Sequence, residues 1–289
     1  MMYGYMAIWK SLRPCQEKAS TVAGFAILIL SMMSQRPKSI RKQPVQRKPK
    51  FTPITLSEHD GVRYLHFGTE WVQGAMRVRK PNWIELEYAQ QMMAWMLFID
   101  QPRHIVQLGL GTGALTKFCY QEYPASWVTA VELNPAVIDV CRSMFSLPPN
   151  DDKLSVLQMD ALLFVQDLEN RRSVDAMQID LYDATARGPV LDSPEFYQAC
   201  AACLSKDGIA TINLFGDHPS FQKNIPAICS AFDHVLVLPE VHEGNRVVIA
   251  FKSEPDFDFA DLYQRAAVIH DITKLPAKSW VDGIKSALI

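Results

Sequence analysis

The stretch "HIVQLGLGTGALTKF", residues His104–Phe118, joins an apolar segment, a glycine-rich turn and the start of a helical pattern. Gly109, Gly111 and Ala114 fit the G-x-G-x-x-G/A spacing of a nucleotide-binding strand-to-helix turn. These glycines and Gly113 would let the backbone approach a ligand without a Cβ in the way. A purely structural tight turn fits the same spacing, and no lysine follows as it does in a triphosphate-binding loop. The segment predicts a nucleotide-binding α/β sheet and leaves the nucleotide open.

Strand and helix patterns alternate after this turn, which is typical of a mostly parallel, Rossmann-like sheet with helices on both faces. Near the end, two strand patterns with a short connection and no helix between them predict an antiparallel hairpin at the sheet's edge. The expected strands are 105–109, 127–132, 154–158, 174–180, 209–214, 234–238 and 246–252, and the expected helices are 113–121, 135–145, 160–168, 194–204 and 218–231.

The chain is expected to have four parts. Strand-like alternation at 61–68 and 75–80 predicts a small N-terminal β-element, and a broad apolar stripe over 83–99 predicts a helix before the sheet. In order, the parts are a tail at 1–50, the β-element at 51–82, the nucleotide-binding domain at 83–255 and a helical extension at 256–289.

The tail is predicted to be disordered or mis-annotated. Its apolar run "VAGFAILILSMM" (22–33) has twelve residues, fewer than the roughly 20 needed to cross a membrane. A secretory signal is one interpretation, although no small-x-small cleavage site follows. We favour translation from Met32 or Met33, which leaves a charged, proline-rich segment too polar to fold. A cytoplasmic protein without membrane contact is therefore expected.

Charge and cysteine content limit the function further. The first 50 residues carry a net charge of +9, so residues 51–289 carry −11. Because an acidic body repels phosphate backbones, no nucleic-acid partner is predicted, whereas a small cationic substrate is. The six cysteines suggest no disulfide framework, and the seven histidines show no metal-ligand spacing with them, so no metal site is predicted.

Three successive predicted strands end in an acid: Glu132, Asp160 and Asp180. In an open α/β sheet, ligands bind outside the carboxyl ends of the strands, so these acids should share one rim. Glu132 can accept hydrogen bonds from both hydroxyls of a ribose. Asp160 can accept from an adenine amine while the backbone N–H of Ala161 faces a ring nitrogen, although Asp160 also fits a helix N-cap. Together, the three acids predict that the bound nucleotide is an adenosyl nucleoside.

These residues resemble the S-adenosyl-binding class I methyltransferase fold and, more narrowly, the spermidine synthase family of aminopropyltransferases. The resemblance covers roughly residues 60–255, through "ELEYAQQMM", "VELNPAVIDVCRSMF", "DALLFV", "IDLYDATARGP" and "SPEFYQAC" in that order. It implies an N-terminal β-element joined to the sheet and a homodimer. It also implies transfer of an aminopropyl group from decarboxylated S-adenosylmethionine to a diamine such as putrescine.

The resemblance also implies roles for single residues. Asp180 matches the catalytic aspartate, Asp183 the second acid of a D-x-x-D motif, Tyr88 a substrate-pocket tyrosine and Gln73 a glutamine before the first helix. An alkyl amine has a pKa near that of lysine, about 10.4, and arrives protonated, so Asp180 could accept its proton. Ordinary loop acids after a strand are the alternative interpretation of Asp180 and Asp183.

The sequence departs from the family at the glycine loop. The family's loop is typically G-G-G-D-G-G, and its aspartate pairs with the aminopropyl ammonium and repels the carboxylate of intact S-adenosylmethionine. Thr112 stands there in this chain, and a neutral hydroxyl is expected to discriminate poorly between the two donors. Gln90 and Ala94 also replace a family acid and a family histidine.

Several functions therefore stay open. An aminopropyltransferase is favoured, because of Asp180, Asp183 and the acidic body. A methyltransferase using S-adenosylmethionine comes second, because of Thr112. A non-catalytic nucleoside-binding module or a nicotinamide enzyme comes last, since a nicotinamide enzyme needs neither Asp160 nor Asp180.

Overall fold

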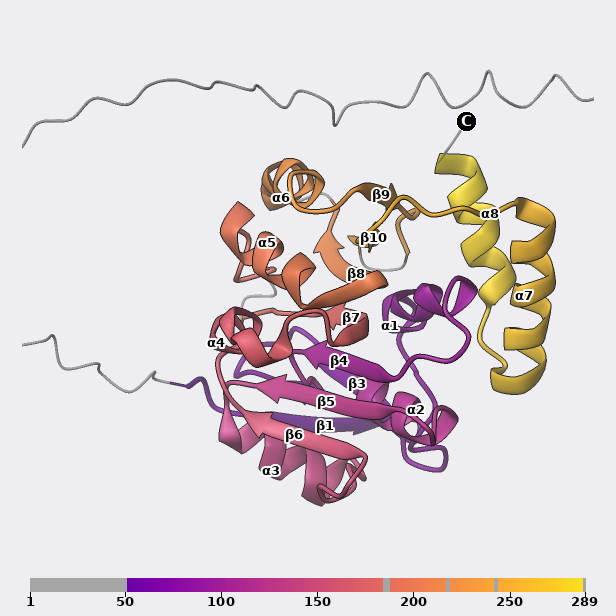
Figure 1. Cartoon of the computed structure of the whole chain (residues 1–289). Coiled ribbons are helices and arrows are strands. Elements are labelled where there is room, and N and C mark those ends of the chain that lie inside the picture. The colour runs from indigo at the N-terminus through magenta and orange to yellow at the C-terminus, as the bar shows by residue number, and fades with distance from the viewer. Residues whose placement is uncertain (1–50, 184–187, 217–218, 242–243, 288–289) are drawn as a thin grey trace, which may run out of the picture. The chain divides into compact units, whose positions relative to one another are not determined.

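A computed structural model describes residues 51–183, 188–216, 219–241 and 244–287. The predicted tail, with the proposed start at Met32 or Met33, lies outside the described residues. Residues 52–289 form one structural unit, whose main layer is a seven-stranded sheet (Figure 1).

The strand order in the main sheet is β6-β5-β4-β7-β8-β10-β9. The first five of these strands are parallel, and β10 runs antiparallel to both of its neighbours. The predicted α/β fold with an antiparallel hairpin at one edge is therefore confirmed. The strands are β4 (His104–Leu108), β5 (Trp127–Glu132), β6 (Leu154–Gln158), β7 (Val174–Ile179), β8 (Leu204–Phe215), β9 (His234–Val237) and β10 (Asn245–Phe251).

Strand order places the candidate site. The chain runs from β4 outward through β5 and β6, and then returns to the other side of β4 to form β7 and β8. Ligands of open α/β sheets bind where the strand order reverses, at the carboxyl ends of the strands. The glycine loop follows β4 and Asp180 follows β7, so both lie at this point.

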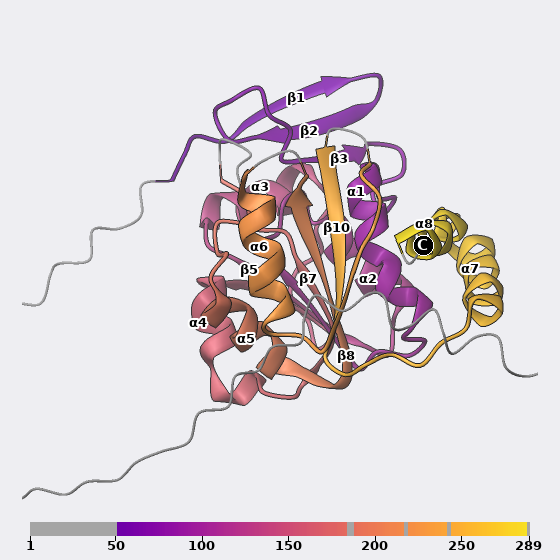
Figure 2. The same cartoon turned by 90° about the horizontal axis from the view of Figure 1, so that it is seen from above.

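Helices cover both faces of the sheet and bury an apolar core on each side. Figure 2 shows α4, α5 and α6 on one side and α1, α2, α7 and α8 on the other. Side-chain caps begin four of the described α-helices: Asn134 for α3, Asp160 for α4, Ser193 for α5 and Asp258 for α7. The helices are α1 (Glu87–Gln91), α2 (Ala114–Glu122), α3 (Pro135–Met144), α4 (Ala161–Gln166), α5 (Pro194–Cys203), α6 (Pro219–Cys229), α7 (Phe259–Thr273) and α8 (Ala277–Ala287), with a 3-10 turn η3 at Leu168–Asn170.

The predicted single helix over 83–99 is wrong. A short α1 passes into a 3-10 helix η2, Met92–Leu97, in which all six side chains are buried. The segment contacts β8, β10, α7 and α8, so it has no exposed face to carry the polar half of an amphipathic helix.

The N-terminal element is a three-stranded antiparallel sheet, β1 (Thr55–His59), β2 (Val62–His66) and β3 (Gly74–Arg77). The sequence predicted β2 and β3 but missed β1. All five residues of β1 are exposed, so the strand lacks the alternation of apolar and polar residues that reveals a half-buried strand.

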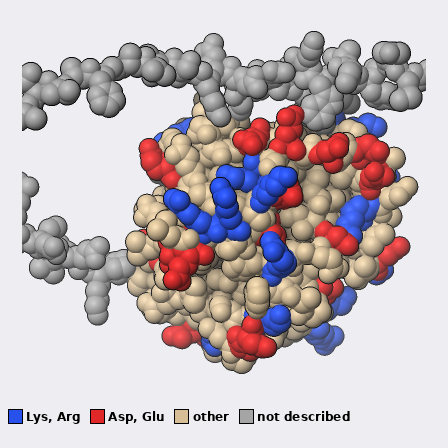
Figure 3. Space-filling model, in the orientation of Figure 1, with Lys and Arg blue, Asp and Glu red and all other residues tan. Residues whose placement is uncertain are grey.

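Charge on this unit is mixed despite its net negative value. On the face seen in Figure 3, acidic side chains surround a group of neighbouring lysine and arginine side chains. Among the described residues, no helix has the length and apolar character to cross a membrane.

A buried lysine on α2 joins the N-terminal element to the domain built around the seven-stranded sheet. Lys117 on α2 is 2% exposed, and its Nζ donates to the carbonyl oxygens of Pro81 at 2.7 Å and Phe145 at 2.6 Å, and to Met76 Sδ at 3.3 Å. Burial lowers the pKa of Lys117 to about 8.

This pKa predicts a pH-dependent stability. Below pH 8 the lysine is charged in both states, and burying its charge destabilises the fold. Between about pH 8 and 10.5 the folded state has already lost the proton that the unfolded state still holds, so stability rises with pH. The free energy of unfolding, measured in urea, should rise by roughly 3 kcal/mol more between pH 7 and 10.5 for the wild type than for Lys117→Met. Parallel pH curves for the two proteins would refute the low pKa.

Candidate active site

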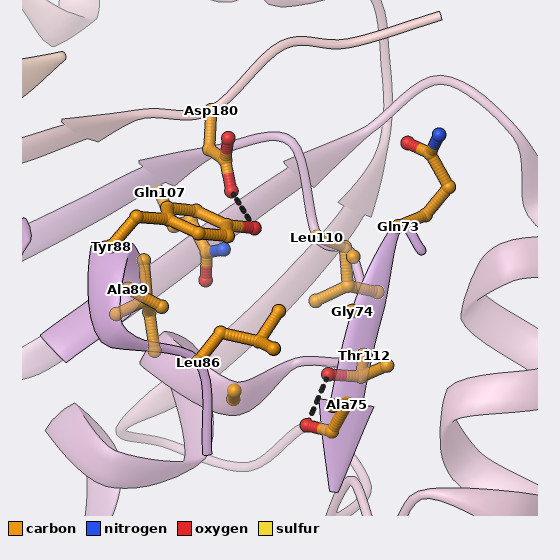
Figure 4. A pocket seen from close by; sticks show the side chains of 13 residues that line it. Gln73, Gly74, Ala75, Leu86, Tyr88, Ala89, Gln107, Leu110, Thr112 and Asp180 are labelled. Carbon is orange, nitrogen blue, oxygen red and sulfur yellow. Dashed lines mark hydrogen bonds between the residues drawn. The ribbon is translucent and has the colours of Figure 1, made fainter. Parts of the chain in front are cut away.

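A hollow opens at the carboxyl ends of β4 and β7, with β3 and α1 forming its other walls (Figure 4). It contains about 320 Å³ of space, part of it open to solvent. Five of the predicted site residues line it, and they come from four separate parts of the sequence: Gln73, Tyr88, the loop with Gly111 and Thr112, and Asp180. The lining residues are Gln73, Gly74, Ala75, Leu86, Tyr88, Ala89, Gln107, Leu110, Gly111, Thr112, Ala114, Leu115 and Asp180.

Asp180 is the one carboxylate among these lining residues, and two side chains hold it. Asn213 Nδ2 donates to its Oδ1 at 2.9 Å, and the Tyr88 hydroxyl donates to its Oδ2 at 3.3 Å. Burial raises the pKa of Asp180, while the bonds from Asn213 and Tyr88 lower it. The result is an oriented carboxyl group with a raised pKa, which suits a proton acceptor.

The sequence reasoning missed Asn213. This residue lies near the end of β8 and is 2% exposed, and its Oδ1 has no partner among the described residues. A polar side chain near the carboxyl end of a buried strand, next to the strand that leads to Asp180, was the available signal.

Gly109 has a structural reason to lack a side chain. Its φ is +88°, and a Cβ at this position would lie 2.1 Å from the carbonyl oxygen of Asp180. The glycine therefore lets the loop after β4 touch the end of β7. Gly111 lines the hollow, whereas Gly113 begins α2 and faces Leu147. Ligand contact through Gly109 and Gly113 stays a prediction.

Glu132 and Asp160 lie along the same rim but are not among the described residues that line the hollow. Glu132 accepts backbone hydrogen bonds from Leu110 at 3.0 Å and from Asn134 at 2.8 Å, so it positions the glycine loop. Burial raises the pKa of Glu132, and these backbone bonds lower it. Asp160 caps α4 by accepting from the N–H of Leu162 at 2.8 Å, so its predicted role as a helix N-cap is confirmed.

Each carboxylate keeps acceptor capacity after these bonds. A carboxylate offers about four lone-pair sites. The backbone N–H groups of Leu110, Leu133 and Asn134 use three sites on Glu132, and that of Leu162 uses one on Asp160. Structural and ligand-binding roles are thus compatible for both acids, and Ala161, the buried first residue of α4, follows Asp160 directly.

Asp183 and Gln73 meet at the edge of the hollow. Gln73 Nε2 donates to the backbone carbonyl of Asp183 at 3.3 Å, while the Asp183 residue itself is exposed. This bond ties the N-terminal element to the segment that carries both acids of the D-x-x-D motif.

Thr112 packs against the N-terminal element. It is 2% exposed, and its hydroxyl donates to the carbonyl oxygen of Ala75 at 3.3 Å (Figure 4). A Cβ on Gly74 would lie 2.7 Å from Thr112 Cγ2, so β3 comes this close only with glycine at that position.

Among the described residues, no group of three or more His, Cys, Asp or Glu side chains is arranged to hold a metal ion.

Comparison with known proteins agrees with this geometry. A family model, the spermine/spermidine synthase domain, matches residues 85–261. A polyamine aminopropyltransferase of Neisseria meningitidis is 32% identical over 243 residues, which cover 83% of this chain and 92% of that protein.

Two solved structures share the fold at low identity. A probable spermidine synthase from Corynebacterium glutamicum gives a TM-score of 0.64 at 19% identity, covering 84% of this chain and 95% of that one. A human methyltransferase-like protein 13, solved with SAH, gives 0.57 at 19% identity, covering 68% and 93%. The family match and the sequence relative decide between these two likenesses: this chain belongs to the spermine/spermidine synthase family of transferases.

Proposed function

We propose that this chain transfers the aminopropyl group of decarboxylated S-adenosylmethionine to an amine such as putrescine. The observation that carries the proposal is the oriented carboxyl group of Asp180. It is held by Tyr88 and Asn213 in a hollow beside the glycine loop. Family membership supports the same reaction.

The donor's nucleoside would bind along the rim beside the hollow. Glu132 would accept from the ribose with its remaining acceptor capacity, and Asp160 with Ala161 would bind the adenine edge. The strand order supports this placement, because β4, β5 and β6 are adjacent and parallel, so the acids and the glycine loop share one edge of the sheet. The aminopropyl end of the donor would then point into the hollow.

Asp180 would prepare the attacking amine. The acceptor arrives as an ammonium, and the carboxylate removes its proton, directly or through water. The freed lone pair attacks the methylene carbon bonded to the sulfonium. The C–N bond forms as the C–S bond breaks, and the electron pair returns to sulfur, giving neutral methylthioadenosine. The proton leaves through Asp180. Tyr88 and Asn213 keep the carboxylate aimed at the amine.

Methyl transfer from intact S-adenosylmethionine is the second candidate function. The observation in its favour is Thr112, which carries no charge where the family's aspartate would repel the donor's carboxylate.

The assay that separates the two functions supplies the purified full chain with putrescine and either donor, and identifies products by mass spectrometry. The proposal expects spermidine and methylthioadenosine in equal amounts from the decarboxylated donor. Asp180→Asn should lose turnover and still bind methylthioadenosine. Methylated product from the intact donor, with no aminopropyl transfer, would overturn the proposal in favour of the second candidate.

The pH dependence should report on Asp180. Asn213→Leu removes a hydrogen bond that lowers its pKa, so the pKa should rise further. The group must lose its proton to act, so the acidic limb of kcat/KM against pH should move up by about one unit. Thr211→Val is the matched control, since Thr211 is buried on the same strand and its hydroxyl has no partner among the described residues. An unmoved limb in Asn213→Leu, or an equal shift in both variants, contradicts this role.

Glu132→Gln should weaken methylthioadenosine binding at least tenfold, because it removes charge-assisted bonds worth roughly 1.5–3 kcal/mol. Asp139→Asn, an exposed carboxylate on α3, controls for the change in net charge. Calorimetry measures both affinities. A dissociation constant that stays at the wild-type value would remove Glu132 from the nucleoside site.

A further inference from the structure

The amide nitrogen of Gln107 is left unpaired in the wall of the hollow. Gln107 lies on β4, is 3% exposed and lines the hollow. The hydroxyl of Thr116, on α2, donates to its Oε1 and so fixes the orientation of the amide. Within the described part of the chain this hydroxyl is the amide's one hydrogen-bond partner. The two N–H groups on Nε2 therefore have no acceptor there.

This nitrogen faces open space rather than packed protein. Nε2 of Gln107 is not one of the sealed side-chain atoms that lack a partner among the described residues, although it lacks one too. Because the residue is otherwise buried and borders the hollow, its N–H groups face that space. The sealed atoms are Gln91 Oε1, Trp95 Nε1, Thr211 Oγ1 and Asn213 Oδ1.

Gln107 lies within reach of a small ligand held at Asp180. Gln107 pairs with Gln178 on β7, and Asp180 follows Gln178 by two residues. Strand geometry then separates the Cα atoms of Gln107 and Asp180 by about 8 Å. Figure 4 draws the Gln107 amide on the Asp180 side of the hollow, away from Thr112. A short aliphatic ligand can therefore contact the carboxyl group with one end and the amide with the other.

The two ends of such a ligand need different chemistry. The Asp180 carboxylate attracts an ammonium, whereas the amide N–H groups need a lone pair. A hydroxyl oxygen supplies that lone pair, and a methyl group leaves the N–H groups unpaired. A second ammonium offers no lone pair and meets the positive end of the N–H dipoles. No second carboxylate is present among the described lining residues to hold it.

We infer that Gln107 determines acceptor specificity, and that the preferred acceptor is a primary amine with a neutral, hydrogen-bond-accepting oxygen at its far end, such as an amino alcohol. The inference rests on the proposed function and narrows its amine. A diamine stays a substrate, with a lower kcat/KM. The transfer step is unchanged: the C–N bond forms, the C–S bond breaks, and the proton of the ammonium leaves through Asp180.

Three acceptors that differ only in their far group test this with the full chain and decarboxylated S-adenosylmethionine. They are 4-aminobutan-1-ol, butylamine and putrescine, and methylthioadenosine formation reports turnover for each. The wild type should use the amino alcohol with a kcat/KM at least fivefold above that of either other amine.

Variants assign this preference to the amide. Gln107→Leu should bring the amino alcohol to within twofold of butylamine, because the N–H donor is gone. Gln107→Glu keeps the shape and offers a carboxylate, so putrescine should overtake the amino alcohol. Gln178→Leu is the matched control, since Gln178 is the buried strand partner of Gln107 and is not among the described lining residues. It should keep the wild-type ratios.

The outcomes separate the inference from the proposed function. Equal or better use of putrescine by the wild type overturns the inference even if no variant folds. Ratios that do not respond in folded Gln107→Leu, or that change equally in Gln178→Leu, also overturn it. In each of these cases methylthioadenosine still forms and the proposed function stands. If none of the three amines yields methylthioadenosine, the proposed function fails and the inference fails with it.

Discussion

The contact between the glycine loop and the end of β7 is the constraint on which the site depends. The backbone of Gly109 lies so close to Asp180 that any Cβ at position 109 would be 2.1 Å from the Asp180 carbonyl oxygen. The Asp180 N–H donates to Leu108 at 2.9 Å, which continues the ladder between β4 and β7 beyond the strands themselves. This pairing sets the catalytic candidate directly beside the loop that would hold the donor. Any larger residue at 109 would move them apart.

The N-terminal element makes the second half of the site. It forms one wall of the hollow through Gln73, Gly74 and Ala75. The Thr112 hydroxyl and the Lys117 ammonium, which belong to the sheet domain, both donate hydrogen bonds to it. The same contacts therefore join the N-terminal element to the sheet domain and hold one wall of the hollow in place. Because the Thr112 hydroxyl donates to Ala75, the glycine loop is held in place by a segment that lies more than thirty residues earlier in the chain.

Much of the fold was predictable because its signals are local. Buried parallel strands are continuous apolar runs, and their alternation with helices and the final hairpin were visible from residue types alone. Tertiary contacts decided the rest. The exposed β1 had no alternation of apolar and polar residues to reveal it. Residues 92–97 form the 3-10 helix η2 in place of the expected α-helix, in a segment that packs against β8, β10, α7 and α8. Two hydrogen bonds of the site, from Asn213 to Asp180 and from Thr112 to Ala75, join residues far apart in the sequence. Sequence spacing could not reveal either bond.

The measurement that tests the central claim most directly is a crystal structure of the chain with methylthioadenosine and putrescine. The account predicts adenine at Asp160 and Ala161, ribose at Glu132, and a thioether sulfur that faces the hollow, with an amine of putrescine against Asp180. A nucleoside bound away from this rim, or a sulfur turned away from Asp180, would contradict it.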